Sequence, residues 1–199
     1  MRKVKPPKVP FHPLPGVAID DVKKLIATCS TTLALRDKAI LLCLLDTGAR
    51  ASEFLDLNLK DVDLTAGAVR IEHGKGDKSR TVFLGSISRR ALRKYLKERE
   101  DLRPNSPLWT TDEGERLKFS GLRQVIERRA SAAGIQTPGL HDFRRSFAIT
   151  MLRNGVDLQT ISRLLGHASL SVTERYLAQE TNDLAEGHRK GSPVDNSNF

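Results

Sequence analysis

The chain has 199 residues, of which 39% are hydrophobic, and this is enough for one domain with a substantial core. Its formal net charge of +9 and its pI near 9.8 favour a polyanionic partner, either nucleic acid or an anionic membrane. No apolar run approaches the roughly 18 residues that span a bilayer and no signal-peptide pattern opens the chain, so no membrane association is expected.

The two cysteines, Cys29 and Cys43, fall in apolar stretches that are expected to be helical. Their spacing matches neither a metal site nor a disulfide framework, so we expect a reducing cytoplasm. Nothing in the sequence calls for a bound metal or another cofactor, and none is expected.

The predicted elements follow a basic, proline-rich stretch, residues 1–16, which is typical of a linker or an arm. A short amphipathic helix starts at Asp20, and the run 39–45 is apolar on all sides, as in a buried central helix. A further short helix is expected near 50–57. Two runs that alternate apolar and polar residues then flank a Gly/Asp-rich turn at 74–77, which is typical of a β-hairpin.

Helices dominate the rest of the chain. Apolar stripes predict one helix over 87–96 and another over 122–133, which Gly134 ends. Three more helices are expected, at about 141–153, 157–165 and 170–178. The polar residues from Glu186 onward are expected to form a mobile tail. The expected fold class is therefore mixed α+β, mainly α-helical, with a small antiparallel sheet around the hairpin.

The helix that begins at His141 places an arginine where a core residue belongs. Arg144 lies in the middle of the apolar stripe that contains Phe143 and Phe147, and His141 lies about 60° from it. Arg145 is expected to point toward solvent. Because an arginine is rarely buried without a partner, Arg144 is expected to meet either an anion inside a cleft or a structural ion-pair partner.

Two candidates near the C-terminus are weak when each is taken alone. Gly166 is expected to cap the preceding helix, which would place His167 on a turn that points away from the core. A lone exposed histidine usually has no function. Tyr176 lies on an apolar stripe and would by itself be interpreted as a core residue, as Tyr95 is.

The remaining candidates lie near the predicted hairpin. Arg50 and Glu53 stand three residues apart on a helix, so an ion pair can orient the guanidinium; the alternative is a surface pair worth under ~1 kcal/mol. Lys75, Lys78 and Arg80 are expected at the hairpin tip. They form either a solvated basic turn or a finger that reaches a phosphate. The glycines there do not match a nucleotide-binding loop.

Four blocks of the sequence resemble the tyrosine recombinase family, which includes phage integrases, Xer-type resolvases and transposon recombinases. The blocks are TGARASEF (47–54), GKGDKSR (74–80), LHDFRRSFA (140–148) and LLGHASLSVTERYL (164–177). They occur in the family's order and spacing, and the resemblance covers residues 17–180. Ala49 and Phe54 stand where leucine is more usual in the family, and neither touches the chemistry.

The resemblance implies the fold of the family's catalytic domain, mainly α-helical with a small three-stranded antiparallel sheet, and a set of functional residues. The catalytic positions are Arg50, Lys75, His141, Arg144, His167 and Tyr176. Glu53 corresponds to an acidic residue that supports the first arginine. Contacts to DNA are expected from Lys75, Lys78, Arg80 and Arg145. The implied reaction cleaves and rejoins DNA through a 3′-phosphotyrosine at Tyr176, without metal or ATP.

The chemistry explains why these residue types are needed. Two arginines, Arg50 and Arg144, can grip the non-bridging oxygens of a phosphate with paired hydrogen bonds. A phenol has a pKa of ~10, so Tyr176 needs a base, for which His141 is the better candidate. Lys75 would protonate the leaving 5′-oxygen, and His167 would donate to the phosphate.

The resemblance also implies partners and a location. These are double-stranded DNA core sites, a homotetramer on DNA with a monomer when free, and the cytoplasm of a prokaryote, at the nucleoid. The tail 181–199 is expected to dock on a neighbouring subunit. Relatives usually carry a further N-terminal domain that closes around DNA, and residues 1–16 look like the remains of the linker to it. Weak, salt-sensitive DNA affinity is therefore expected.

Three other functions are weighed against the recombinase. A type IB topoisomerase uses the same active-site logic, but the size of the chain and the spacing from the LLGH block to Tyr176 favour the recombinase. A non-catalytic DNA-binding module of the same fold would not need every catalytic position to be filled. A metal-dependent nuclease would need a carboxylate or histidine cluster, which the sequence does not offer.

Overall fold

The computed structural model of the chain describes residues 16–30, 34–72 and 79–166. In chain order its elements are α1 (Ile19–Ala27), α2 (Leu35–Thr47), α3 (Ala51–Asp56), the 3-10 helix η2 (Leu59–Asp61), β1 (Val62–Asp63), β2 (Ala68–Ile71), β3 (Arg80–Phe83), α4 (Ser86–Lys97), α5 (Phe119–Ala133), α6 (Leu140–Arg153) and α7 (Leu158–Leu165). The three strands form one antiparallel sheet in the order β1-β2-β3. This confirms the predicted fold class. The helix expected at 170–178 and the tail lie outside the described residues.

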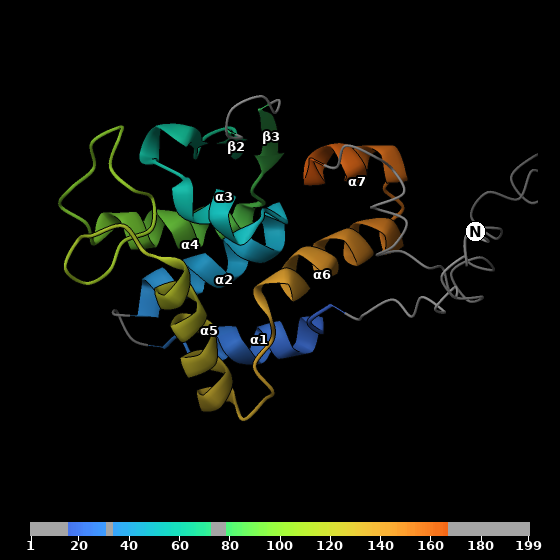
Figure 1. Cartoon of the computed structure of the whole chain (residues 1–199), viewed down its shortest axis with the longest axis horizontal. Coiled ribbons are helices and arrows are strands. Elements are labelled where there is room, and N and C mark those ends of the chain that lie inside the picture. The colour runs from blue at the N-terminus through green and yellow to red at the C-terminus, as the bar shows by residue number, and fades with distance from the viewer. Residues whose placement is uncertain (1–15, 31–33, 73–78, 167–199) are drawn as a thin grey trace, which may run out of the picture.

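Helix α2 is the central element, and α4 and α6 pack on it (Figure 1). Ala39, Ile40, Leu41 and Leu44 are fully or almost fully buried, as the apolar sequence predicts, whereas Leu42 and Leu45 on the remaining side of the helix are only partly buried. Gly48 ends the helix with φ +57°, a left-handed conformation that favours glycine. The chain then turns directly into α3.

The hairpin pairs β2 with β3 in the predicted antiparallel manner. Val69 stands opposite Val82, and Ile71 opposite Arg80. Val69, Ile71 and Val82 are buried, whereas the alternate residue Phe83 is exposed. Since side chains alternate across a strand, Arg80 lies on the same face of β3 as Val82. The turn with Lys75 and Lys78 lies outside the described residues.

A second, smaller core joins α6 to α7. It consists of Phe147 and Ala148 from α6 with Ile161 and Leu165 from α7. Figure 1 shows α7 stacked beside α6 on the side of the molecule that carries β3, and α7 also contacts that strand. Among the described residues, no helix is long and apolar enough to cross a membrane.

A buried aspartate connects α2 to α5. The carboxylate of Asp37 is fully buried and accepts hydrogen bonds from Arg128 at 2.7 Å and from Arg129 at 2.6 Å. Arg129 also donates to the carbonyl of Thr28 at 2.9 Å. A buried carboxylate needs such partners, so this group fixes α5 against α2.

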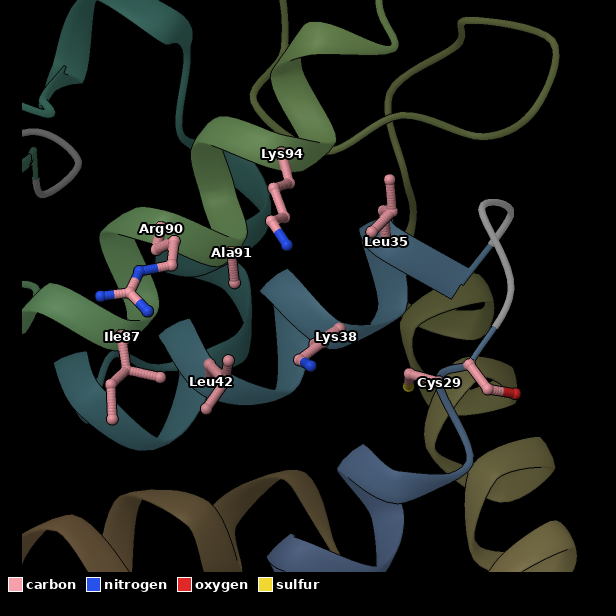
Figure 2. Close-up of a pocket in the computed structure, with 9 residues that line it drawn as sticks. Cys29, Leu35, Lys38, Leu42, Ile87, Arg90, Ala91 and Lys94 are labelled. Carbon is pink, nitrogen blue, oxygen red and sulfur yellow. The ribbon is translucent and has the colours of Figure 1, made fainter.

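Two expectations about apolar residues are corrected near α4. Ile87 is exposed rather than part of the buried stripe, because it lines an open hollow between α2 and α4 with Lys38, Arg90 and Lys94 (Figure 2).

Cys29 lies beyond the end of α1 rather than in a helix. Its thiol is buried and free, and this burial raises its pKa. None of the predicted site residues lines this hollow.

Candidate active site

Three of the predicted site residues, from two distant blocks of the sequence, line one cavity. Arg50, at the start of α3, shares a cavity of about 790 Å³ with His141 and Arg144 from the first two turns of α6. Helix α5 forms another wall, to which Phe119 and Arg123 contribute. The loop from α5 to α6 completes the lining. The lining carries three arginines, Arg50, Arg123 and Arg144, and one carboxylate, Glu127, so its net charge is positive, which suits an anionic ligand.

Arg144 is buried as predicted, with only 2% of its surface exposed. Its Nη1 donates to the carbonyl of Gly48 at 2.8 Å, and its Nη2 donates to the carbonyl of Leu165 at 2.7 Å. These carbonyls lie at the C-terminal ends of α2 and α7, where unpaired carbonyls carry partial negative charge. Two helix ends therefore help to hold the buried guanidinium, a kind of partner that the sequence did not suggest.

The expected ion pair between Arg50 and Glu53 is present. Arg50 Nη1 donates to Glu53 Oε1 at 2.7 Å, and the backbone N–H of Arg50 donates to Oε2 at 2.9 Å. The carboxylate is 7% exposed, whereas the side chain of Arg50 is 43% exposed. This is therefore more than a surface pair. Glu53 anchors the arginine from inside the molecule and leaves its guanidinium open to the cavity.

Glu53 has a second arginine partner that sequence reasoning missed. Arg80 Nη2 donates to Glu53 Oε2 at 2.6 Å, and its Nη1 donates to Oε1 at 3.0 Å. Burial is the largest influence on Glu53 and would raise its pKa. The hydrogen bonds from Arg80 and Arg50 oppose it and together hold the pKa of Glu53 at about 2. Glu53 is therefore ionised throughout the neutral range.

This pairing corrects the expected position of Arg80 at an exposed hairpin tip. Arg80 begins β3, and its side chain is only 8% exposed. The sequence does contain a signal for this, because Arg80 has the same parity along the strand as the buried Val82 and Leu84. A residue in phase with a buried face needs a buried partner, and Glu53 is that partner.

His141 lies at the exposed start of α6, beside the two arginines of that helix. Partial burial lowers its pKa below the ordinary 6.5, and the positive charges of Arg145 and Arg144 lower it further. The imidazole is therefore neutral at neutral pH and able to accept a proton. Arg145 does not point freely into solvent as expected, because it is half-buried and pairs with Asp142 at 2.8 Å.

The other predicted site residues, Lys75, Lys78, His167 and Tyr176, lie outside the described residues. Within the described ranges, no group of three or more His, Cys, Asp or Glu side chains is arranged to hold a metal ion. The part of the site that the structure describes consists of two arginines, a histidine and the carboxylate that supports one arginine.

Comparison with known proteins identifies the family of the chain and several relatives. Residues 17–183 match the profile of the phage integrase family. The tyrosine recombinase XerC of Thermodesulfovibrio yellowstonii is 37% identical over 188 residues, which are 89% of this chain and 62% of that protein. The chain thus spans less than two thirds of that relative.

Solved structures agree with the sequence relatives. The crystal structure of XerA recombinase matches 95% of this chain and 67% of its own, with a TM-score of 0.78 and 31% sequence identity. The XerH site-specific recombinase, bound to its palindromic difH substrate in a post-cleavage complex, matches 91% of this chain and 53% of its own, with a TM-score of 0.71 and 28% identity. The fold is therefore that of a tyrosine recombinase catalytic domain, and the chain belongs to the phage integrase family.

Proposed function

We propose that this chain is the catalytic part of a site-specific DNA recombinase, which cleaves and rejoins double-stranded DNA through a 3′-phosphotyrosine at Tyr176. The observation that carries the proposal is the convergence of Arg50, His141 and Arg144 on one cavity. Membership of the phage integrase family supports it. The XerH relative is itself bound to its DNA substrate in a post-cleavage complex.

In the proposed reaction, the phenol oxygen of Tyr176 attacks a phosphodiester phosphorus, and the bond to the 5′-oxygen breaks. The phenol proton passes to the neutral imidazole of His141, and Lys75 protonates the leaving 5′-oxygen. His167 donates a hydrogen bond to the phosphate. A 5′-hydroxyl from another strand then reverses the step, so the bond energy is conserved and neither metal nor ATP is consumed.

The two arginines supply the charge that this reaction needs. Negative charge builds on the non-bridging oxygens in the transition state, and preorganised donors are worth several kcal/mol each there. Arg50 is anchored by a buried carboxylate and Arg144 by two helix ends, so neither guanidinium has to reorganise when the phosphate binds. A guanidinium suits this role because it is planar and permanently charged and holds its donors in a rigid fork.

The proposed partners follow from the same family. DNA contacts would come from Lys75, Lys78 and Arg145, while Arg80 is too buried to be among them. On two DNA sites the chain would act as a homotetramer, with residues 181–199 docked on a neighbouring subunit, and it would be a monomer when free.

The test is a covalent trapping experiment. DNA flanking this gene, nicked near the cleavage site, is incubated with the protein, and the mixture is run on a denaturing gel. We expect an adduct that survives EDTA and disappears with Tyr176→Phe. The matched control is Tyr95→Phe, because Tyr95 is a buried tyrosine whose hydroxyl lies 3.0 Å from that of Thr110 in the core.

Each alternative predicts a different outcome. An adduct that persists in Tyr176→Phe, or that EDTA abolishes, contradicts the proposed mechanism, and EDTA sensitivity indicates a metal-dependent nuclease. Binding without any adduct indicates a non-catalytic module. A type IB topoisomerase relaxes a supercoiled plasmid that lacks the site and yields no recombinants, whereas the proposed enzyme needs the site.

A further inference from the structure

Arg80 does not line the cavity of the candidate active site, but it contacts Glu53, the residue that supports Arg50. Its three donor nitrogens face two different elements: Nη1 and Nη2 bind the two carboxylate oxygens of Glu53, and Nε donates to the carbonyl of Leu164 at 2.8 Å. Glu53 belongs to α3 and Leu164 to the last turn of α7. One guanidinium therefore connects β3 to both elements, and β3 and α7 are in contact (Figure 1).

The carboxylate that Arg80 holds is the one that orients Arg50. Glu53 Oε1 accepts from Arg80 and from Arg50 Nη1, and Oε2 accepts from Arg80 and from the backbone N–H of Arg50. A two-pronged contact fixes the plane of a carboxylate as well as its position. With Arg80 in place, the carboxylate cannot rotate about its axis, and the direction in which it holds Arg50 is set.

Arg80 also supports the end of α7, which contributes to the placement of the second arginine. The carbonyl of Leu165, next to the residue that Arg80 binds, accepts from Arg144. Gly166 packs tightly on the same guanidinium, since a Cβ at this position would lie 2.8 Å from Arg80 Nη1. The groups that Arg80 contacts therefore hold both arginines of the site: Glu53 binds Arg50, and the end of α7 binds Arg144.

We propose that Arg80 is a positioning residue for the reaction, which holds Arg50 in its reactive orientation through Glu53 and fixes the end of α7 through Leu164. This inference rests on the proposed function and extends it. The requirement is for the fork of a guanidinium, not for a positive charge alone, because three donors in one plane must reach three acceptors. A lysine at position 80 provides the charge but not this geometry.

The experiment compares Arg80→Lys with Arg129→Lys. Arg129 is a matched control because it also donates from three nitrogens, to the carboxylate of Asp37 and to the carbonyl of Thr28, but in a pair between α2 and α5 outside the cavity. Both variants are measured for melting temperature, for DNA affinity and for the rate of adduct formation at saturating DNA.

We expect Arg80→Lys to slow adduct formation about 10- to 100-fold, as misplacement of a catalytic group by up to about 1 Å can do, with DNA affinity within about threefold of the unaltered protein. Arg129→Lys is expected to lower the melting temperature but to leave the rate of the folded protein unchanged. Equal rates for Arg80→Lys and the unaltered protein, or equal slowing in both variants, would overturn the proposal.

A double variant separates positioning from general loss of structure. If Arg80 acts on Arg50 through Glu53, Arg80→Lys slows the Glu53→Gln variant less than it slows the unaltered protein. Multiplicative effects would show that Arg80 does not act through Glu53.

A readout without DNA keeps this inference distinct from the proposed function. Arg80→Lys is expected to raise the pKa of Glu53, because the two-pronged hydrogen bond from Arg80 is lost, as carbon NMR of its carboxyl group would show. An unchanged pKa overturns the pairing even if the protein forms adducts. If the pKa rises but no protein, altered or not, forms an adduct, it is the proposed function that fails.

Discussion

At the scale of single residues, the protonation state of His141 depends on its neighbours. Burial and the positive charges of Arg145 and Arg144 all disfavour the imidazolium, so its pKa lies below 6.5. As pH falls through that pKa, the imidazole becomes protonated and can no longer accept the phenol proton. Adduct formation should therefore have an acid limb below pH 6.5 that follows His141.

The arginine next to this histidine offers a direct test. Arg145→Gln removes the largest of the three positive influences on His141, the others being Arg144 and Arg50, and it also releases Asp142, whose charge favours the imidazolium, so the pKa of His141 should rise. The acid limb of the rate profile should move to higher pH by the same amount. NMR titration of His141 measures the first shift, and single-turnover rates measure the second.

The control is Arg153→Gln, which removes an exposed arginine at the far end of the same helix and should move neither quantity. If the pKa of His141 rises while the acid limb stays in place, His141 is not the base in this reaction, and another group must accept the proton from Tyr176.

At the scale of elements, the site depends on how α2 ends. Gly48 combines a left-handed backbone with a carbonyl that accepts from Arg144, and the ring of Phe147 lies against its Cα. A Cβ at position 48 would lie 2.6 Å from Phe147 Cδ1, closer than packed atoms allow. The turn that places Arg50 and the acceptor of Arg144 is thus specified both by conformation and by packing.

Two glycine-to-alanine variants separate these effects. Gly134 also ends a helix, α5, with φ +64°, but a Cβ there would meet no atom within 4 Å. Gly134→Ala should therefore cost only the left-handed conformation, about 1 kcal/mol of the free energy of unfolding. Gly48→Ala should cost about 1–3 kcal/mol more, because the Cβ also displaces Phe147.

Urea denaturation of the two variants gives these free energies directly. Equal losses for Gly48→Ala and Gly134→Ala would mean that Phe147 moves aside without cost. In that case the packing of α6 against the end of α2 would not constrain the site.

Periodicity predicted most elements because each pattern reports burial along one segment. The burial of most of residues 39–45 and the burial of Arg144 could be predicted, because each follows from the pattern of apolar residues along a single helix. The partners of Arg144 could not, since they depend on which helix ends meet in three dimensions. Ile87 shows the same limit, because an apolar stripe does not indicate whether a neighbour covers its outer edge. For Arg80, the alternation along the strand indicates that its side chain faces the buried side, but it does not indicate that Glu53 is its partner.

At the scale of the whole molecule, the net charge of +9 makes phosphate contacts the main expected source of DNA affinity. Each contact releases a counterion, so affinity should fall steeply with salt, about 1,000-fold or more between about 50 and 200 mM if six or more phosphates are bound. Fluorescence anisotropy with labelled site DNA at several salt concentrations measures the slope.

The slope also tests whether DNA binds to one defined face. Lys78→Gln should reduce it by about 1, as expected when a single phosphate contact is lost. Lys23→Gln makes the same change in net charge on α1, at an exposed lysine that pairs with Asp20, and should leave the slope unchanged. Equal reductions in both variants would mean that affinity follows net charge alone. A loss confined to Lys78→Gln would place the DNA on the hairpin side, the side from which β3 presents Arg80 to Glu53 behind the site.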